Sequence, residues 1–242
     1  MRLDQALVLR SLCESRTEAQ ELIGKSLVLV NGAIITKQTK DILDTDEVEV
    51  QGRRSFVSRG GDKLKGILQD IYGGDEAIKT HLAGKCALDV GSSTGGFTDC
   101  LLSYGVAHVD AVDVGTDQLH TRLRSDTHVS LFESTDIREF VSARLYDIVV
   151  ADLSFISLEP LFERILSFGK TGAAFFLLIK PQFEVGKGNT KKGVVKDMSL
   201  VLELLRKYEV IAKLHGLSEL QILPCHIQGG EGNQEFFLYG QK

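Results

Sequence analysis

The sequence of 242 residues has little of what marks several protein classes. It contains no tryptophan, three prolines and four cysteines, and the cysteines show no CxxC spacing. This scarcity argues against a disulfide framework and a zinc site, and it favours free thiols in a reducing cytoplasm. The longest apolar run, AAFFLLI at 173–179, is far shorter than the roughly 20 residues of a membrane-spanning helix. The charged N-terminus argues against a signal peptide. We therefore expect a cytoplasmic protein with no membrane partner.

Charge is unevenly distributed along the chain, although the net charge is −5. Basic residues gather in 51–66 and again in 186–196, where GKGNTKKGVVK has four lysines and no acid. Local basic patches on an acidic protein can bind a phosphate backbone. Solvated surface charge explains the same composition, so composition alone leaves both interpretations open.

The pattern of secondary structure changes near residue 55. Before it, Ser15 and Glu18 form a capping-box pair at the start of a helix. Further along, Asn31-Gly32 is a favoured hairpin turn. We expect a small α+β domain over residues 1–55 with a thin core. Its predicted elements are a helix at 15–26, a hairpin at 27–36 and a strand at 46–50.

Residues 56–242 alternate between predicted strands and helices. This alternation predicts an α/β fold with a Rossmann-like sheet, mostly parallel with the last strand antiparallel. The predicted strands are 86–91, 108–115, 146–154 and 173–181, the helices are 96–105, 158–169 and 199–214, and a hairpin spans 219–240.

The stretch ALDVGSSTGGFTDCLL, residues 87–102, leads from a strand through a glycine-rich turn into a helix. A dinucleotide fingerprint aligned on Gly91 would place Ser93 where the backbone must approach a pyrophosphate. No G-K-[ST] of a P-loop follows. What remains is Asp89-x-Gly91-x-x-x-Gly95, a pattern that suits S-adenosylmethionine because an acid at the strand end favours a cationic methionine group. A turn that only makes a tight strand–helix joint has the same pattern.

A second acid belongs to the same predicted site. Asp113 ends the next strand and is placed to accept hydrogen bonds from both hydroxyls of a cofactor ribose. The cofactor contacts expected from this interpretation are Asp89, Gly91, Ser92, Ser93, Thr94, Gly95, Gly96, Phe97, Thr98 and Asp113.

Two strands expected to be buried each end in an ionisable residue, Asp152 and Lys180. Both would lie at the ligand edge of the sheet, with Lys63 and Glu235 as two further candidates for one polar site. A lysine at the end of an apolar strand also reaches water by snorkelling, which is the alternative. The sequence has no G-x-S-x-G nucleophile, and its six histidines show no metal-binding spacing. We expect no metal.

Seven motifs in order carry a family resemblance. They are SRGGDKL, LDVGSSTGGFTDCLL, AVDVG, ADLSFISL, LIKPQFEVGK, GVVKD and GNQEFF. Together they resemble the TlyA family of FtsJ-like ribosomal-RNA 2′-O-methyltransferases, historically also called haemolysins. RLDQAL and SRTEAQELI in the first 55 residues resemble the RNA-binding domain of ribosomal protein S4.

The resemblance implies a class I methyltransferase domain over 56–242 that uses S-adenosylmethionine, and an S4-type RNA-binding domain before it. It implies cytidines of ribosomal RNA or ribosomal subunits as the substrate, and Asp136 as a contact for the adenine amino group. The family's Lys-Asp-Lys-Glu tetrad matches Lys63, Asp152, Lys180 and Glu235. In the small domain the resemblance favours phosphate contacts over solvated surface charges for Arg2, Arg10, Arg16 and Lys25. Further candidates for RNA binding are Arg59 and the loop residues Lys187, Lys191 and Lys192. The lysine-rich loop could close over the RNA beside Lys180, and a plain mobile loop is the alternative.

In this interpretation Lys180 acts at the ribose hydroxyl, either as a base or as a charged stabiliser of the developing alkoxide. Two other functions compete with it: a membrane-active haemolysin, and a non-catalytic RNA-binding factor in ribosome assembly. No predicted helix suffices for the first, and the intact tetrad argues against the second. The sequence makes no prediction of oligomeric state.

Overall fold

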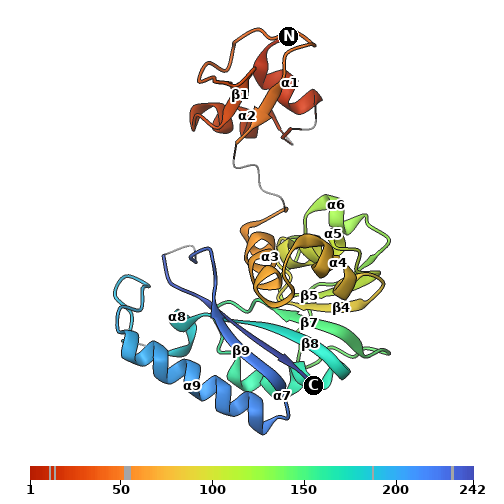
Figure 1. Cartoon of the computed structure of the whole chain (residues 1–242), viewed down its shortest axis with the longest axis vertical. Helices are drawn as coiled ribbons and strands as arrows, with labels where there is room; N and C mark the ends of the chain where they lie inside the picture. The colour runs from red at the N-terminus through yellow and green to blue at the C-terminus, as the bar shows by residue number, and fades with distance from the viewer. Residues whose placement is uncertain (11, 14, 52–55, 187, 230–231) are drawn as a thin grey trace. The chain divides into compact units, whose positions relative to one another are not determined.

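The computed structural model describes residues 1–10, 12–13, 15–51, 56–186, 188–229 and 232–242. The chain forms two compact units, Met1–Arg54 and Ser55–Lys242 (Figure 1). The boundary predicted at residue 55 lies outside the described residues.

The first unit packs two helices on a small antiparallel sheet in the order β2-β1-β3. Asn31 and Gly32 both have positive φ, 49° and 78°, which confirms the hairpin turn expected from their sequence. The Glu18 side chain, expected in the capping box, lies outside the description. Helix α1 was not expected from the sequence. The elements are α1 (Leu3–Leu9), α2 (Arg16–Gly24), β1 (Val28–Val30), β2 (Ala33–Ile34) and β3 (Val48–Val50).

The second unit is built on a seven-stranded sheet in the order β6-β5-β4-β7-β8-β10-β9. The first five strands in this order run parallel, and β10 is antiparallel to both β8 and β9. The predicted α/β class and the antiparallel last strand are therefore confirmed. The strands are β4 (Cys86–Val90), β5 (His108–Val112), β6 (Val129–Phe132), β7 (Tyr146–Ala151), β8 (Gly169–Ile179), β9 (Ser218–Pro224) and β10 (Phe236–Gln241).

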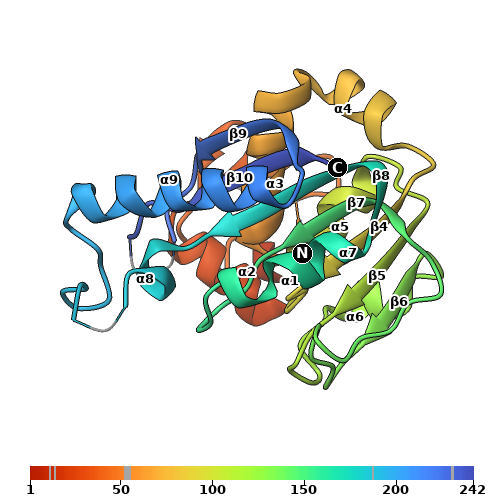
Figure 2. The same ribbon diagram turned by 90° about the horizontal axis from the view of Figure 1, so that it is seen from below.

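Helices cover both faces of this sheet (Figures 1 and 2). One face packs against α3 (Arg59–Tyr72), α4 (Asp75–Leu82) and α5 (Gly96–Ser103), and the other against α7 (Phe162–Ser167) and α9 (Met198–Leu214). Along β8, Phe175 and Leu177 join the α7–α9 core, whereas Phe176 and Leu178 join the α3–α5 core. This alternation follows from the period of two along a strand. The remaining short helices are α6 (Thr121–Arg124), η1 (Glu159–Leu161) and α8 (Pro181–Glu184).

Helix α9 buries the face that its sequence predicts, because Val201, Leu204, Tyr208 and Ala212 recur at helical spacing. None of the four cysteines, all of which lie in the described ranges, forms a disulfide; Cys86 is half-buried and the other three are buried. Edge strand β6 and helix α3 were not expected.

The strand order also predicts where a ligand binds. From β4 the chain continues outward to β5 and β6, and then returns to place β7 on the other side of β4. A crevice forms at such a reversal beyond the carboxyl ends of the strands, and it is the usual ligand site of open α/β sheets. The turn between β4 and α5 lies at this point.

Candidate active site at the carboxyl ends of the strands

Glycine is required at two positions of the turn that follows β4. Gly91 has φ +81°, and a Cβ there would lie 2.7 Å from the carbonyl oxygen of Asp152. Gly95 has φ +94° and caps the N-terminus of α5. A side chain at either position would be strained or obstructed. The turn therefore brings backbone close to both the end of β7 and the start of α5.

A pocket opens beside this turn. Most of its lining comes from the predicted cofactor residues, while Ser58, Gly60 and Ser154 were missed by the sequence reasoning. Each of the missed residues lies within a motif already noticed, SRGGDKL or ADLSFISL, and membership of these motifs was the signal that could have found them. The pocket is lined by Ser58, Gly60, Asp89, Gly91, Ser92, Ser93, Thr94, Gly96, Phe97, Asp152 and Ser154.

Asp89 is the most unusual group in this pocket because it is completely buried without a cationic partner in the described part of the chain. Its Oδ2 accepts hydrogen bonds from the Thr98 backbone N–H at 3.0 Å and the Thr98 hydroxyl at 2.7 Å. Its Oδ1 has no partner among the described residues. Burial raises the pKa of Asp89 to about 7, against the opposing effect of the Thr98 bonds. A buried, unpaired carboxylate oxygen of this kind suits a cationic ligand group.

Asp113 lies directly after β5 and holds the turn in place. Its two carboxylate oxygens accept hydrogen bonds from the backbone N–H groups of Ser93 and Gly115, each at 2.7 Å. The Ser93 hydroxyl donates to the Gln118 side-chain oxygen at 3.0 Å. Ser93 has φ 45°, so these contacts stabilise a conformation that is uncommon outside glycine.

Asp136, like the predicted cofactor residues Gly95, Thr98 and Asp113, is not among the residues that line this pocket. Its Oδ1 accepts from the Arg138 backbone N–H at 2.9 Å, and its Oδ2 pairs with the Arg138 guanidinium at 2.5 Å. These bonds hold the pKa of Asp136 at about 2. The backbone N–H of Thr135, which precedes Asp136, donates to the Asp113 carbonyl at 2.9 Å. Asp136 therefore follows a residue that is bonded to the segment just after β5.

The four predicted tetrad residues form two lysine–carboxylate pairs. Lys63, from α3, is 2.5 Å from the Glu235 carboxylate, and both side chains are buried. Lys180 forms an ion pair with Asp152 and donates a hydrogen bond to the Ser154 hydroxyl at 2.7 Å.

Strand register explains why the two pairs lie together. Phe236 of β10 is paired with Ile179 of β8, so continuing the antiparallel register by one residue places Glu235 across from Lys180. Asp152 follows the neighbouring strand β7, whose last pair with β8 is Ala151 with Leu177. Charged residues therefore lie at the same edge of three adjacent strands, after β7 and β8 and before β10.

An exposed aromatic residue lies near Lys180 and was missed by the sequence reasoning. Phe155 is 90% exposed and has φ +66°, an outlier for a bulky residue. Its ring packs on Phe183 with centroids 5.2 Å apart, and the Lys180 ammonium lies 5.9 Å from the Phe183 ring centre. Strained, exposed aromatics of this kind occur at ligand-binding sites.

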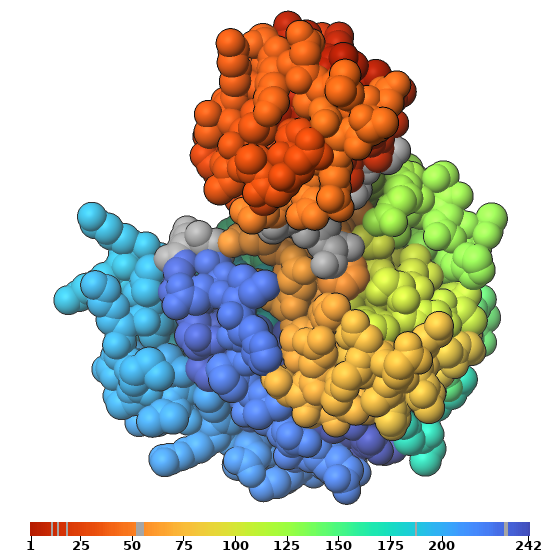
Figure 3. Space-filling model, turned by 45° about the horizontal axis from the view of Figure 1, so that its top comes forward, coloured from red at the N-terminus to blue at the C-terminus, as the bar shows by residue number. Residues whose placement is uncertain are grey.

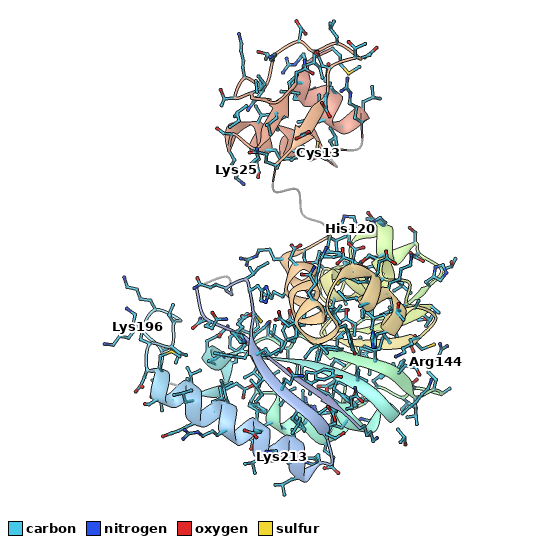
Figure 4. All side chains as sticks on the ribbon, in the orientation of Figure 1. Cys13, Lys25, His120, Arg144, Lys196 and Lys213 are labelled. Atoms are coloured by element: carbon cyan, nitrogen blue, oxygen red, sulfur yellow. The ribbon has the colours of Figure 1, made fainter. Side chains whose placement is uncertain are left out.

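In the first unit, several predicted RNA contacts also bind groups within the unit. Arg2 and Arg16 both pair with the buried carboxylate of Asp4, at 3.0 and 2.9 Å. Arg10 donates to the carbonyl groups of residues 43, 44 and 46. Lys25 forms an exposed pair with Glu21 at 3.4 Å (Figure 4). The arginines therefore stabilise the unit, and Arg2 and Arg16 still remain partly exposed.

In the second unit, the predicted RNA contacts Arg59, Lys191 and Lys192 are exposed. Lys187 lies outside the described residues. Within the described ranges, no group of three or more His, Cys, Asp or Glu side chains could hold a metal ion. No helix in this part of the chain has the length and hydropathy to cross a membrane.

Comparison with known proteins gives two family matches. Residues 56–242 match the FtsJ-like methyltransferase family, and residues 1–48 match the S4 domain family.

Similar proteins match over nearly the full chain. The 16S/23S rRNA (cytidine-2′-O)-methyltransferase TlyA of Mycobacterium tuberculosis is 40% identical over 98% of this chain and 88% of its own length. Hemolysin A of Brachyspira hyodysenteriae is 35% identical over 99% of both chains. A solved structure from Streptococcus thermophilus, also named a hemolysin, has a TM-score of 0.72 at 32% identity, covering 100% of this chain and 88% of its own. This chain belongs to the FtsJ-like methyltransferase family, with an S4 domain at its N-terminus.

Proposed function

We propose that this protein transfers a methyl group from S-adenosylmethionine to the 2′-hydroxyl of a cytidine ribose in ribosomal RNA. Family membership supports methyl transfer, and the relative from M. tuberculosis is named for this substrate. The single observation that carries the proposal is the convergence of two lysine–carboxylate pairs beside the pocket at the β4 turn.

The pocket residues fit S-adenosylmethionine. The unpaired Oδ1 of Asp89 gives a buried acceptor for a positively charged group. Gly91 has no Cβ to meet the Asp152 carbonyl, so the turn and the end of β7 can line the same pocket. Asp113 retains a lone pair on each carboxylate oxygen for the hydroxyls of the cofactor ribose. We assign to Asp136 the contact with the adenine amino group. When bound, the cofactor supplies an electrophilic methyl group on a positively charged sulfur.

Lys180 acts as a charged hydrogen-bond donor at the ribose oxygen. Its ion pair with Asp152 and its hydrogen bond to the Ser154 hydroxyl hold the Lys180 side chain in one direction. An ammonium group at this point stabilises negative charge that develops on the oxygen, while the hydroxyl proton leaves to water. Lys63 and Glu235 neutralise each other, so they position the neighbouring groups without adding net charge.

The RNA is held by contacts outside the pocket. We assign phosphate binding to the S4-type domain at 1–55, through Arg2, Arg10, Arg16 and Lys25, and to Arg59, Lys187, Lys191 and Lys192 of the methyltransferase domain at 56–242. The exposed ring of Phe155 offers a stacking surface for a base that has left its helix, close to Lys180.

The test is transfer of labelled methyl from S-adenosylmethionine to separated ribosomal subunits by wild type and Lys180→Ala. We expect kcat to fall by roughly 10²- to 10⁴-fold because the charged donor at the oxygen is lost. Cofactor affinity, measured by calorimetry, should stay within about twofold.

A matched control is Lys170→Ala. Lys170 lies near the start of β8, the strand that leads to Lys180, and its ammonium pairs with Asp147 at 2.8 Å. This pair lies at the amino end of β8, away from the pocket, so transfer should be unchanged. Wild-type rates in Lys180→Ala would contradict the proposal. A wild-type protein that binds cofactor and RNA without transfer would instead support a non-catalytic assembly factor.

A further inference from the structure

The lysine-rich loop between α8 and α9 contains an ordered turn. Lys191 and Val194 exchange backbone hydrogen bonds of 2.8 and 3.1 Å. The two residues between them, Lys192 and Gly193, have φ of 51° and 78°. Two successive positive φ angles within such a pair of bonds define a type I′ turn. The backbone that carries Lys191 and Lys192 is therefore fixed by its own hydrogen bonds.

A single buried amide joins this turn to the strand that carries Glu235. Asn233 is 2% exposed. Its Nδ2 donates to the Gly193 carbonyl at 2.8 Å, and its Oδ1 accepts from the Val195 N–H at 3.0 Å. The donor and the acceptor of the Asn233 amide are therefore both hydrogen-bonded to the backbone, on either side of Val194. Leaving either partner of a buried hydrogen bond of this kind unpaired is unfavourable, so these two bonds hold the turn against Asn233.

A hydrogen bond to Glu235 also holds the start of the lysine-rich loop. Gln182, on α8, donates to the Glu235 carboxylate at 3.2 Å. Asn233 precedes Glu235 by two residues, and its carbonyl accepts from the Gly229 N–H at 2.9 Å. A Cβ at Gly229 would lie 2.5 Å from the Glu235 carboxylate, so Gly229 packs closely against this tetrad residue. The lysine-rich loop is therefore joined to Glu235 through Gln182, and its type I′ turn is joined to Asn233, two residues before Glu235 in the sequence.

The charge of the loop identifies what it binds. Between Glu184 and Asp197 the sequence has four lysines and no acidic residue. Lys191 and Lys192 are exposed on the type I′ turn. Figure 4 labels Lys196 in the same loop, and Figure 3 shows the loop in light blue at the surface. An exposed pair of lysines on a fixed backbone suits the phosphates of a nucleic acid strand.

We propose that Asn233 is a positioning residue that fixes the turn at Lys191–Val194, so that Lys191 and Lys192 bind RNA phosphates beside the reacting ribose. This inference rests on the proposed function and adds to it the residue that sets the distance between phosphate contacts and tetrad. Asn233 itself touches neither RNA nor cofactor.

The experiment measures methyl transfer to separated ribosomal subunits by the full chain at several NaCl concentrations. Asn233→Ala should raise KM for the subunits about tenfold while kcat and cofactor affinity stay within about twofold. The slope of log(kcat/KM) against log[NaCl] should become shallower by about 1.5, because two phosphate contacts are lost. A substitution that only weakened folding would leave this slope unchanged.

The control is Asn189→Ala, the same substitution in the same loop. Asn189 donates to the Val185 carbonyl at 2.6 Å and is exposed, so KM and the salt slope should not change. The double variant Lys191→Ala/Lys192→Ala should match Asn233→Ala, and combining all three substitutions should add little further. If Asn233→Ala fails to fold, the lysine double variant carries the test.

Two outcomes would overturn the inference. One is an unchanged KM and salt slope in Asn233→Ala or in the lysine double variant. The other is a fall in kcat and cofactor affinity with the wild-type slope, which would make Asn233 a support for Glu235 alone. If the wild type transfers no methyl, the proposed function fails, but filter binding of naked ribosomal RNA over the same salt series still tests the lysine turn separately.

Discussion

The two units each bury one aspartate completely, and they treat it in opposite ways. In the first unit, Asp4 on α1 accepts hydrogen bonds from Arg2, Arg16 and Gln20. These bonds, led by Arg2, hold the pKa of Asp4 well below its usual range. In the second unit, Asp89 has only Thr98 as a partner for one oxygen, and burial raises its pKa to about 7.

The difference separates a structural carboxylate from one kept for a ligand. Asp4 joins the start of α1 to α2 through fully used oxygens, so its charge stabilises the unit. Asp89 lines a pocket and has one carboxylate oxygen without a partner among the described residues, so its charge is unfavourable in the protein alone, as expected for the ligand contact proposed above. Burial alone therefore does not distinguish Asp4 from Asp89. The number of hydrogen-bond partners of each carboxylate does.

Among the substitutions that test the comparison of the two aspartates, Asp89→Asn should have the largest effect. The amide keeps the shape and an acceptor for Thr98 but removes the charge. Affinity for S-adenosylmethionine should fall about 30-fold, the equivalent of a charge-assisted hydrogen bond of about 2 kcal/mol. The free energy of unfolding at pH 8 should not fall, because an uncompensated buried charge has been removed. Calorimetric titration and thermal melting check both, and an unchanged affinity would refute the ligand role of Asp89.

Asp4→Asn is the matched substitution in the other unit, with an intermediate effect. The local free energy of unfolding around α1 and α2 should fall by about 1 to 2 kcal/mol. The loss is limited because Arg2 and Arg16 are 39% and 53% exposed and can be hydrated when released. Hydrogen–deuterium exchange of the full chain measures this loss. Cofactor affinity should be that of the wild type, and a fall comparable to that in Asp89→Asn would break the comparison.

The smallest effect is a pH dependence of opposite sign in the two units. Because the folded-state pKa of Asp89 is raised to about 7, its contribution to stability is fully present below about pH 4 and is lost as pH rises through 7. Asp4 has a lowered pKa, so its contribution is present above about pH 4 and is lost on acidification.

The pH dependence of cofactor affinity tests the raised pKa of Asp89. It should rise about tenfold between pH 6 and 8 as the carboxyl loses its proton. In Asp89→Asn this rise should disappear, while in Asp4→Asn it should persist. Calorimetry in buffers matched for ionic strength checks all three proteins, and a rise retained in Asp89→Asn would assign the titration to another group.

Much of the second unit's fold could be predicted because its signals are local. The strands are apolar runs bounded by turns, and α9 repeats its apolar residues at helical spacing. The position of β10 between β8 and β9 was not readable, because a hairpin can join a sheet by either of its strands. Helix α3 escaped prediction because it carries Gly60, Gly61 and Gly66, which lower helix propensity, and its stability comes from packing on α5 and the sheet.

The candidate site shows the same limit. The types of the tetrad residues could be predicted, but their pairing could not, because Lys63 and Glu235 lie 172 residues apart in the sequence. Which carboxylate each lysine meets depends on the register of β10 against β8. The exposure of Phe155 depends on one left-handed backbone angle, and the contacts of Asn233 depend on a turn formed 40 residues earlier.

The place of β10 inside the sheet also sets an order of events during synthesis. The first unit is closed by contacts within its own 54 residues, so it can fold while the rest of the chain is still being made. The second cannot complete its sheet until Phe236–Gln241 have left the ribosome, since β9 joins only through β10. Glu235 arrives with that strand. The S4 domain can therefore fold before Glu235 meets Lys63, so the site proposed for methyl transfer is the last part of the chain to be completed.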